Sequence, residues 1–273
     1  MTTLVSIPSP GLAGLPGPLL RLEHIDLSFA GVKAINDISF EVARGEICAI
    51  IGPNGAGKSS MLNVINGVYH PQRGTVVFDG ERRHQMQPHH SARRGIARTF
   101  QNIALFRGMT VLENVMTGRN LSRRAGFLSQ ALRLPKARRE DHEVRAHAES
   151  ILEFLRIQAH RNTPVGRLPY GLQKRVELGR ALAAEPKLLL LDEPMAGMTF
   201  DEKEEMCRFI LDANHTLGTT VVLIEHDMGV VMDLSDHVVV LDYGRKIGDG
   251  PPDAVRANQD VIDAYLGVVH AEA

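Results

Sequence analysis

The chain has 273 residues, of which 44% are apolar and 23% are charged, a composition typical of a soluble globular protein with room for one large domain. Its formal net charge of −1 lacks the basic excess of most nucleic-acid-binding proteins, so we expect no nucleic-acid partner. No stretch reaches the roughly 18 apolar residues of a membrane helix, so work at a membrane would require another protein to hold the chain there. The two cysteines, Cys48 and Cys207, suggest no disulfide framework and fit a reducing cytosol.

The first part of the chain predicts a tail followed by two strands. Residues 1–19 are rich in proline, glycine and serine, and we expect them to form a disordered tail. From Leu20 to Phe29 the apolar residues alternate imperfectly, which indicates a strand with an irregularity near His24. Ile38 to Val42 alternates cleanly, as in a half-exposed second strand. We therefore expect an antiparallel β edge on the core that follows.

Several later segments are short, continuous apolar runs, a pattern of strands buried on both faces in a parallel sheet covered by helices. These runs are Ile47 to Ile51, Leu188 to Leu191, Val221 to Ile224 and Val238 to Leu241. Helical patterns lie between them, at about 58–68, 172–184, 201–216 and 228–235. The alternation predicts α/β architecture with a mixed sheet.

The middle of the chain, at about 88–175, is charged and helical in character and carries little strand signal. We interpret it as a helical subdomain inserted into the α/β core. Residues 20–270 then form a single domain, which a short amphipathic helix over Gln259 to Gly267 closes.

A glycine-rich loop follows the apolar run at Ile47 to Ile51 and matches the pattern G-x-x-x-x-G-K-[ST]. Its glycines allow successive backbone N–H groups to cradle phosphate oxygens, and the following helix points its positive dipole end at the same anion. Lys58 is placed to reach the β- and γ-phosphates, and Ser59 to place its hydroxyl on Mg²⁺. The predicted nucleotide-binding residues are Gly52, Pro53, Asn54, Gly55, Ala56, Gly57, Lys58, Ser59 and Ser60. The pattern predicts a P-loop NTPase core that binds ATP with Mg²⁺.

Two adjacent carboxylates follow the apolar run at Leu188 to Leu191. Ligand sites in open α/β sheets lie at the carboxyl ends of strands, where Asp192 and Glu193 emerge. We expect Asp192 to hold Mg²⁺ through water and Glu193 to activate the attacking water as a general base.

These motifs, in this order, resemble those of the ATP-binding subunits of ABC transporters, from Leu20 to Gly267. Within that family the chain is most similar to the branched-chain amino acid importer ATPases. The closer match is carried by Arg98-Thr99-Phe100-Gln101, by Leu105 to Val115 and by Ile224-Glu225-His226-Asp227-Met228. The inserted stretch from about Leu121 to Asp141 is also similar in position and character.

The resemblance implies roles for further residues. Phe29 matches the aromatic residue that stacks on adenine. Gln101 matches the glutamine loop, whose amide contacts Mg²⁺ or the attacking water and whose loop meets the membrane subunit. His226 matches the histidine that contacts the γ-phosphate. The resemblance thus implies catalytic roles for Glu193, His226 and Gln101, and metal binding by Ser59, Gln101 and Asp192.

One segment departs from the family pattern. The family's signature, Leu-Ser-Gly-Gly-Gln or in this branch often Leu-Ser/Ala-Tyr-Gly-Gln, acts on a nucleotide held by the partner ATPase. This chain has Leu168, Pro169, Tyr170, Gly171, Leu172 and Gln173. Gly171 is retained at the start of a helix, whereas Pro169 brings neither a hydroxyl nor an N–H group. The usual Asn-Pro is also missing after Glu193, where the chain has Thr199-Phe200.

The family resemblance implies an importer ATPase, peripheral at the cytoplasmic face of the inner membrane. Its partners would be a second ABC ATPase subunit, identical or not, transmembrane permease subunits and, indirectly, a solute-binding protein. The solute would be branched-chain amino acids or related small polar or organic acids. Two alternatives are a soluble ABC ATPase acting on ribosomes or DNA, and a small-molecule P-loop kinase. The first usually carries two ATPase units or a long coiled coil, and the second has no use for the ordered signature and histidine.

Overall fold

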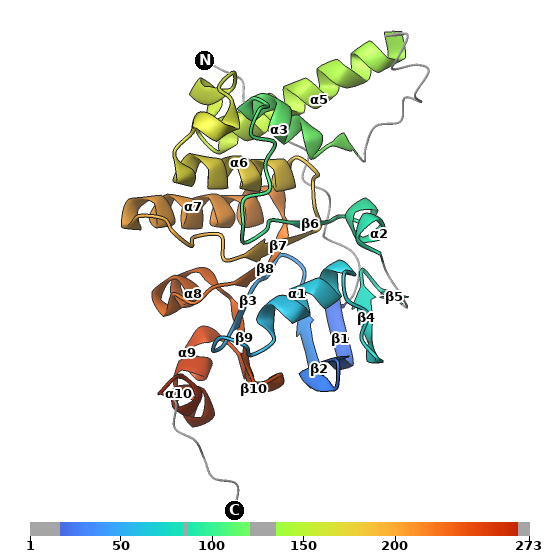
Figure 1. Cartoon of the computed structure of the whole chain (residues 1–273), viewed down its shortest axis with the longest axis vertical. Coiled ribbons are helices and arrows are strands. Elements are labelled where there is room, and N and C mark those ends of the chain that lie inside the picture. Colours follow the sequence, from blue (N-terminus) through green and yellow to red (C-terminus); the bar gives the residue numbers. More distant parts are fainter. Residues whose placement is uncertain (1–16, 84–86, 121–134, 267–273) are drawn as a thin grey trace, which may run out of the picture.

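Two β-sheets organise the chain in the computed structural model, which describes residues 17–83, 87–120 and 135–266. Most of the predicted tail therefore lies outside the described residues, as does most of the inserted stretch from 121 to 141. The architecture confirms the predicted α/β fold (Figure 1).

The first sheet is antiparallel, with strand order β2-β1-β4-β5. It forms the predicted β edge. The irregularity expected near His24 is present, because the pairing of the first two strands shifts register between Leu22 and Ile25, where His24 has φ 51°. The strands are β1 (Leu20–Phe29), β2 (Val32–Val42), β4 (Arg73–Phe78) and β5 (Glu81–Arg83).

The second sheet has six strands in the order β10-β9-β3-β8-β7-β6. All neighbours pair in parallel except β10, which is antiparallel to β9. The carboxyl ends of the five parallel strands consequently meet at one edge of the sheet. The strands are β3 (Ile47–Ile51), β6 (Ile96–Arg98), β7 (Leu188–Asp192), β8 (Thr220–Ile224), β9 (His237–Asp242) and β10 (Arg245–Gly250).

The central strands are apolar on both faces because each face packs against a different layer. In β3, Ile47 and Ala49 belong to the apolar core on the helical side, together with residues of the long helices. Cys48 and Ile50 point the other way, into a second core shared with the antiparallel sheet and the helix after the phosphate loop. Side chains alternate with period 2 along a strand, so a continuous apolar run fills both cores.

The helices cover the faces and ends of the sheets. Figure 1 shows α3, α5 and α6 gathered at the end of the molecule away from the antiparallel sheet, whereas α9 and α10 lie at the opposite end, near β10. In the described residues no helix is long and apolar enough to cross a lipid bilayer. The helices are α1 (Lys58–Asn66), α2 (Pro88–Arg93), α3 (Val111–Thr117), α5 (Pro135–Phe154), α6 (Tyr170–Leu182), α7 (Phe200–Leu217), α8 (Met228–Leu234), α9 (Pro252–Arg256) and α10 (Gln259–Leu266), with 3-10 turns η2 (Gln158–His160) and η3 (Val165–Arg167).

Strand β6 is the part of the main sheet that the sequence pattern did not indicate. It lies within 88–175, the stretch interpreted as helical, yet Ile96, Ala97 and Arg98 pair in parallel with β7. A strand of three residues is too short to display a period. It matters for the site because it delivers the following residues, up to Gln101, to the carboxyl edge.

Candidate active site

The phosphate loop leaves β3 and enters α1 between two close backbone contacts. Gly52 has φ 144°, and a Cβ there would lie 2.0 Å from the carbonyl oxygen of Leu241. Gly57 has φ 102°, and its Cβ would lie 2.6 Å from the carbonyl oxygen of Ala34. Both positions therefore need glycine, on steric and conformational grounds. The loop is thus fixed by its neighbours in the folded state.

Lys58 folds its side chain back over this loop. Its ammonium group donates to the carbonyl oxygens of Gly52 at 2.7 Å and Pro53 at 2.9 Å. Burial lowers the pKa of Lys58, and the nearby charges of Glu193 and Asp192 oppose that shift. The ammonium is therefore held next to the backbone groups proposed to bind phosphate. Of the remaining loop residues, Ala56 is buried, Pro53 and Ser60 are half-buried, and Asn54, Gly55 and Ser59 are exposed.

Asp192 ends β7 with its side chain only 7% exposed. Its Oδ2 atom accepts a 2.8 Å hydrogen bond from Arg98, the last residue of β6. Arg98 also donates to the side chain of Asn63 in α1 at 2.5 Å. One carboxylate oxygen of Asp192 is thus held by a protein cation that also contacts the helix after the phosphate loop.

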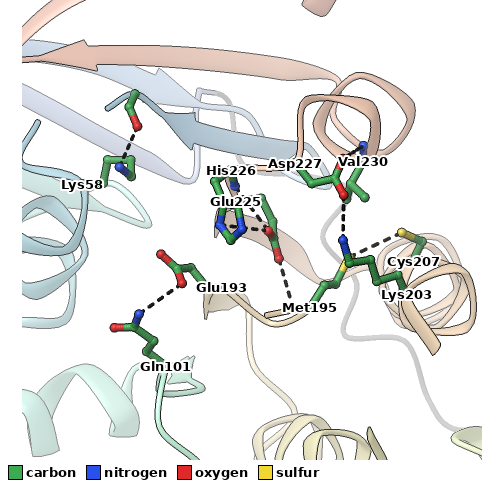
Figure 2. Close-up of polar contacts among 11 residues, drawn as sticks. Lys58, Gln101, Glu193, Met195, Lys203, Cys207, Glu225, His226, Asp227 and Val230 are labelled. Carbon is green, nitrogen blue, oxygen red and sulfur yellow. Dashed lines mark hydrogen bonds and ion pairs between the residues drawn. The ribbon is translucent and has the colours of Figure 1, made fainter. Parts of the chain in front are cut away.

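Glu193 is half-buried and has φ 48°, which turns the chain sharply at the end of β7. Its backbone N–H donates to the carbonyl oxygen of Ile224 at 3.0 Å, which binds the turn to the end of β8. Its Oε2 atom accepts a 3.1 Å hydrogen bond from the side-chain amide of Gln101. The structure therefore brings two of the three predicted catalytic residues into direct contact (Figure 2).

The glutamine loop is attached to helix α6 by buried charges. The ammonium group of Lys174, 3% exposed, donates to the carbonyl oxygen of Gln101 at 3.1 Å. The carboxylate of Glu177, 1% exposed, accepts from the backbone N–H groups of Phe100 at 3.4 Å and Ala104 at 3.3 Å. Burial raises the pKa of Glu177 and lowers that of Lys174. The position of Gln101 is thereby tied to the helix that carries the signature segment.

His226 follows the end of β8, and 65% of its side chain is exposed. Its backbone N–H donates to Oε2 of the preceding residue, Glu225, at 3.3 Å. Figure 2 shows Lys58, Gln101, Glu193 and His226, which come from four segments at the carboxyl edge of the main sheet. The structure thus places the phosphate-loop lysine and the three predicted catalytic residues at one edge of the sheet.

Phe29 ends β1 with 44% of its surface exposed. Its ring meets the ring of Tyr69 edge to face, with centroids 4.9 Å apart and an angle of 69° between the planes. An exposed aromatic ring held at its edge by a second ring can offer a face to a flat, apolar ligand.

The signature segment turns its polar groups inward. Pro169 stands before the first turn of α6 and provides no side-chain cap. The side-chain amide of Gln173 donates to the carbonyl oxygen of Leu168 at 2.8 Å, and Leu172 packs against the apolar core. Gly171 is buried, and a Cβ there would lie 2.2 Å from Oε1 of Glu202 in α7. Tyr170, by contrast, remains 44% exposed.

Sequence reasoning assigns no role to four buried or nearly buried charged residues of the site: Arg98, Lys174, Glu177 and Glu225. Arg98 and Glu225 each follow or end a strand at the carboxyl edge, where a charged residue next to an apolar run is itself a signal. Lys174 and Glu177 are three positions apart and so share one face of α6. Only the folded structure shows what they contact.

Comparison with known proteins identifies the family. A family model described as "ABC transporter" matches residues 35–196, and one described as "Branched-chain amino acid ATP-binding cassette transporter" matches residues 245–271. The high-affinity branched-chain amino acid transport ATP-binding proteins BraF of Pseudomonas aeruginosa and LivG of Escherichia coli are each 38% identical over 92% of this chain and 98% of their own length. A crystal structure of the ADP conformation of an ATP-binding cassette of an ABC transporter superposes with a TM-score of 0.80 at 32% identity, over 92% of this chain and 99% of that one. This chain therefore belongs to the ABC transporter family, as one of its ATP-binding, ATP-hydrolysing cassette subunits.

Proposed function

We propose that this subunit energises the uptake of branched-chain amino acids, or of related small polar or organic acids, from the cytoplasmic face of the inner membrane. The observation that carries the proposal is full-length similarity to ATPases named for branched-chain amino acid transport, which extends to the C-terminal stretch 245–271. The same similarity does not favour an ATPase acting on ribosomes or DNA.

Glu193 is the proposed general base for hydrolysis. The carboxylate of Glu193 is half-buried at the carboxyl edge, and one of its oxygens is hydrogen-bonded to Gln101. Its second oxygen is then able to orient and deprotonate the attacking water. Lys58 would place positive charge against the β- and γ-phosphates, and His226 would contact the γ-phosphate from the end of β8. The side chain of His226 is exposed and therefore accessible to nucleotide.

Three residues proposed for this site carry oxygen atoms that suit Mg²⁺. The hydroxyl of Ser59, the amide oxygen of Gln101 and the carboxylate of Asp192 are oxygen donors, the kind Mg²⁺ prefers. Asp192 would act through water, using the oxygen that Arg98 does not hold. When bound, Mg²⁺ would neutralise phosphate charge. The glycines at 52 and 57, where no side chain fits, support a loop shaped for close backbone approach to phosphate.

The permease is proposed to dock beside the glutamine loop. An open cavity of about 750 Å³ lies there, and its lining includes Arg98, Phe100 and Arg180. Phe100 and Phe106 are 45% and 55% exposed, a high exposure for phenylalanine. A second ATPase subunit would contribute its signature segment to the phosphate loop of this chain, and a solute-binding protein would deliver the solute to the permease.

The test is solute uptake in cells whose chromosomal copy carries Glu193→Gln. Uptake of radiolabelled leucine, isoleucine and valine is expected to fall to background, while the variant remains at normal abundance on the membrane. Uptake of radiolabelled urea, short amides and aromatic acids is measured in the same cells. Normal uptake of all three amino acids would refute the substrate assignment. If the uptake of one of the other solutes is lost, that solute identifies the correct substrate class.

A further inference from the structure

Glu225 is a buried carboxylate that lies between the ends of β7 and β8, close to the proposed catalytic residues Glu193 and His226. It is 2% exposed and stands directly after the apolar strand β8, just before His226. Its Oε1 atom accepts a 3.0 Å hydrogen bond from the backbone N–H of Met195, and its Oε2 atom accepts a 3.3 Å hydrogen bond from the backbone N–H of His226. The side chain of Glu225 thus holds both the turn that follows Glu193 and the backbone of His226 (Figure 2).

Both oxygens of Glu225 are engaged with N–H donors. Burial raises the pKa of Glu225, while the N–H groups of Met195 and His226 lower it. A buried carboxylate that accepts two backbone hydrogen bonds costs free energy when one of them is lost, because the group cannot regain water. The segment around Glu193 and His226 is therefore held in a defined geometry.

The other side of His226 is fixed as well. Asp227 caps helix α8 by accepting from the backbone N–H of Val230, and it accepts a 2.8 Å hydrogen bond from the ammonium group of Lys203 in α7. The backbone of His226 is consequently anchored through both neighbouring residues, although its own side chain is exposed. The exposed imidazole also lies close to the buried carboxylate, with His226 Nδ1 4.0 Å from Oε2 of Glu225. An anchored backbone with an exposed side chain suits a group that must meet a ligand at a fixed place.

We propose that Glu225 is a positioning residue for ATP hydrolysis: it sets the distance between Glu193, which follows β7, and His226, which lies beyond the end of β8, without touching nucleotide. This inference rests on the hydrolytic site described under the proposed function. It does not depend on which solute is transported. It also gives a reason for a buried carboxylate, which does not stabilise an apolar core.

Glu225→Gln is the sharpest change, because it keeps the shape of the side chain. A carboxamide has one acceptor oxygen and one NH₂ group, so it can accept from Met195 or from His226 but must turn a donor against the other N–H. In the assembled transporter we expect kcat to fall by roughly tenfold or more, which corresponds to loss of one hydrogen bond to a charged group. KM for ATP, and nucleotide affinity of the purified chain, should stay within about twofold, since the phosphate loop is not altered.

Asn214→Asp is the matched control. The buried side-chain amide of Asn214 donates to the carbonyl oxygens of Gly45 at 2.8 Å and Thr219 at 2.9 Å, so it also joins two segments of the main sheet. Those segments precede β3 and β8, at the opposite edge from the site. Aspartate has the same shape as asparagine, but it would place a carboxylate oxygen next to the carbonyl oxygens of Gly45 and Thr219, which are also acceptors. It should lower the melting temperature while kcat stays within about twofold of wild type.

The outcomes are distinct. A lower kcat in Glu225→Gln at unchanged KM, with normal kcat in Asn214→Asp, supports positioning. Normal turnover in Glu225→Gln, or an equal loss in both variants, overturns it. Should Glu225→Gln fail to fold, Glu225→Asp keeps both acceptors on a shorter stem, and normal turnover in that variant also overturns the proposal. Glu193→Gln measured alongside separates the two ideas, because full activity there refutes the general base and not the role of Glu225.

Discussion

Gln101 and Glu193 are 92 positions apart in the chain, yet the amide of one donates a 3.1 Å hydrogen bond to the carboxylate of the other. The contact exists because β6 and β7 are neighbours in the parallel sheet and both end at the same edge. The backbone of Gln101 is in turn held by Lys174 of α6. A displacement of α6 would therefore move Gln101 relative to Glu193, the proposed general base, which links the helix of the signature segment to the proposed hydrolytic site.

Replacing Glu193, the proposed general base, should separate nucleotide binding from hydrolysis. In Glu193→Gln we expect hydrolysis to fall by roughly 10²-fold or more, because water activation is lost while the phosphate contacts remain. ATPase activity of the assembled transporter and nucleotide affinity of the chain are the two measurements. Glu204→Gln, at an exposed position on α7, is the control and should hydrolyse normally. Near-normal turnover in Glu193→Gln would contradict the assignment.

Removing the phosphate-loop ammonium should act on affinity. Lys58→Ala loses a charge-assisted contact to phosphate, so ATP affinity should drop roughly 10- to 100-fold. Titration with a fluorescent nucleotide measures this directly. Arg139→Ala, on the exposed face of α5, changes the net charge equally and should leave the affinity unaltered. Equal affinities for the Lys58 variant and wild type would show that Lys58 does not reach the nucleotide.

The chain should associate when it binds ATP. In the proposed assembly each nucleotide lies between the phosphate loop of one ATPase and the signature segment of the other, so ATP stabilises the pair by mass action. Light scattering of Glu193→Gln, which we expect to hold ATP unhydrolysed, should show a rise in mass on adding ATP with Mg²⁺. If the mass of this chain by itself does not change with ATP, but rises when a second, different ATPase subunit is added, the assembly is a heterodimer.

The signature segment should make the two nucleotide sites unequal in such a heterodimer. Pro169 supplies no cap, Leu172 packs on the core, and the amide of Gln173 is bonded within its own chain. The nucleotide site that uses this segment should bind ATP but hydrolyse it more slowly than the other site. One lost hydrogen bond to charged phosphate would lower its rate by about 10- to 100-fold. Restoring Pro169→Ser with Leu172→Gln should raise ATPase activity of the complete transporter. Unchanged activity with two equally active wild-type sites would show that the substitutions are neutral.

A pH dependence of stability follows from His237. Its imidazole lies 2.6 Å from Asp249 and 3.4 Å from Glu46, and hydrogen bonds to Asp249, Cys48 and Glu46 raise the pKa of His237 from 6.5 to about 12. A raised pKa stabilises the folded chain fully below pH 6.5, and that contribution is lost as pH rises from 6.5 toward 12. Urea unfolding at about pH 6 and about pH 9 should show a fall in unfolding free energy for wild type.

The variant His237→Gln should be less stable at about pH 6 and should lack most of this pH dependence. Its control is His24→Gln, which breaks the exposed His24–Asp37 pair and should change the free energy of unfolding little. The same slope with pH in wild type and His237→Gln would assign the dependence to other groups.

Local patterns in the chain are enough to specify the chemistry of this protein. The phosphate loop is contiguous, and a glycine pattern between an apolar strand and a helix specifies its own conformation. The apolar runs of β3, β7 and β8 indicate strands buried on both faces, and strands of that kind share one carboxyl edge. The amino-acid sequence alone therefore places Asp192 and Glu193 at the edge that carries the phosphate loop, whereas the role of His226 is implied by the family resemblance.

How those groups hold one another depends on the packing of distant segments. The sheet order puts β6 next to β7, which gives Asp192 its ion pair with Arg98 and brings Gln101 to Glu193. In the sequence Glu225 is one more polar residue after a strand, and its bond to the backbone of Met195 exists only in the folded chain. Local pattern reports which face a residue occupies, whereas a hydrogen bond between distant segments depends on the packing of several elements together, and no period in the sequence encodes that distance.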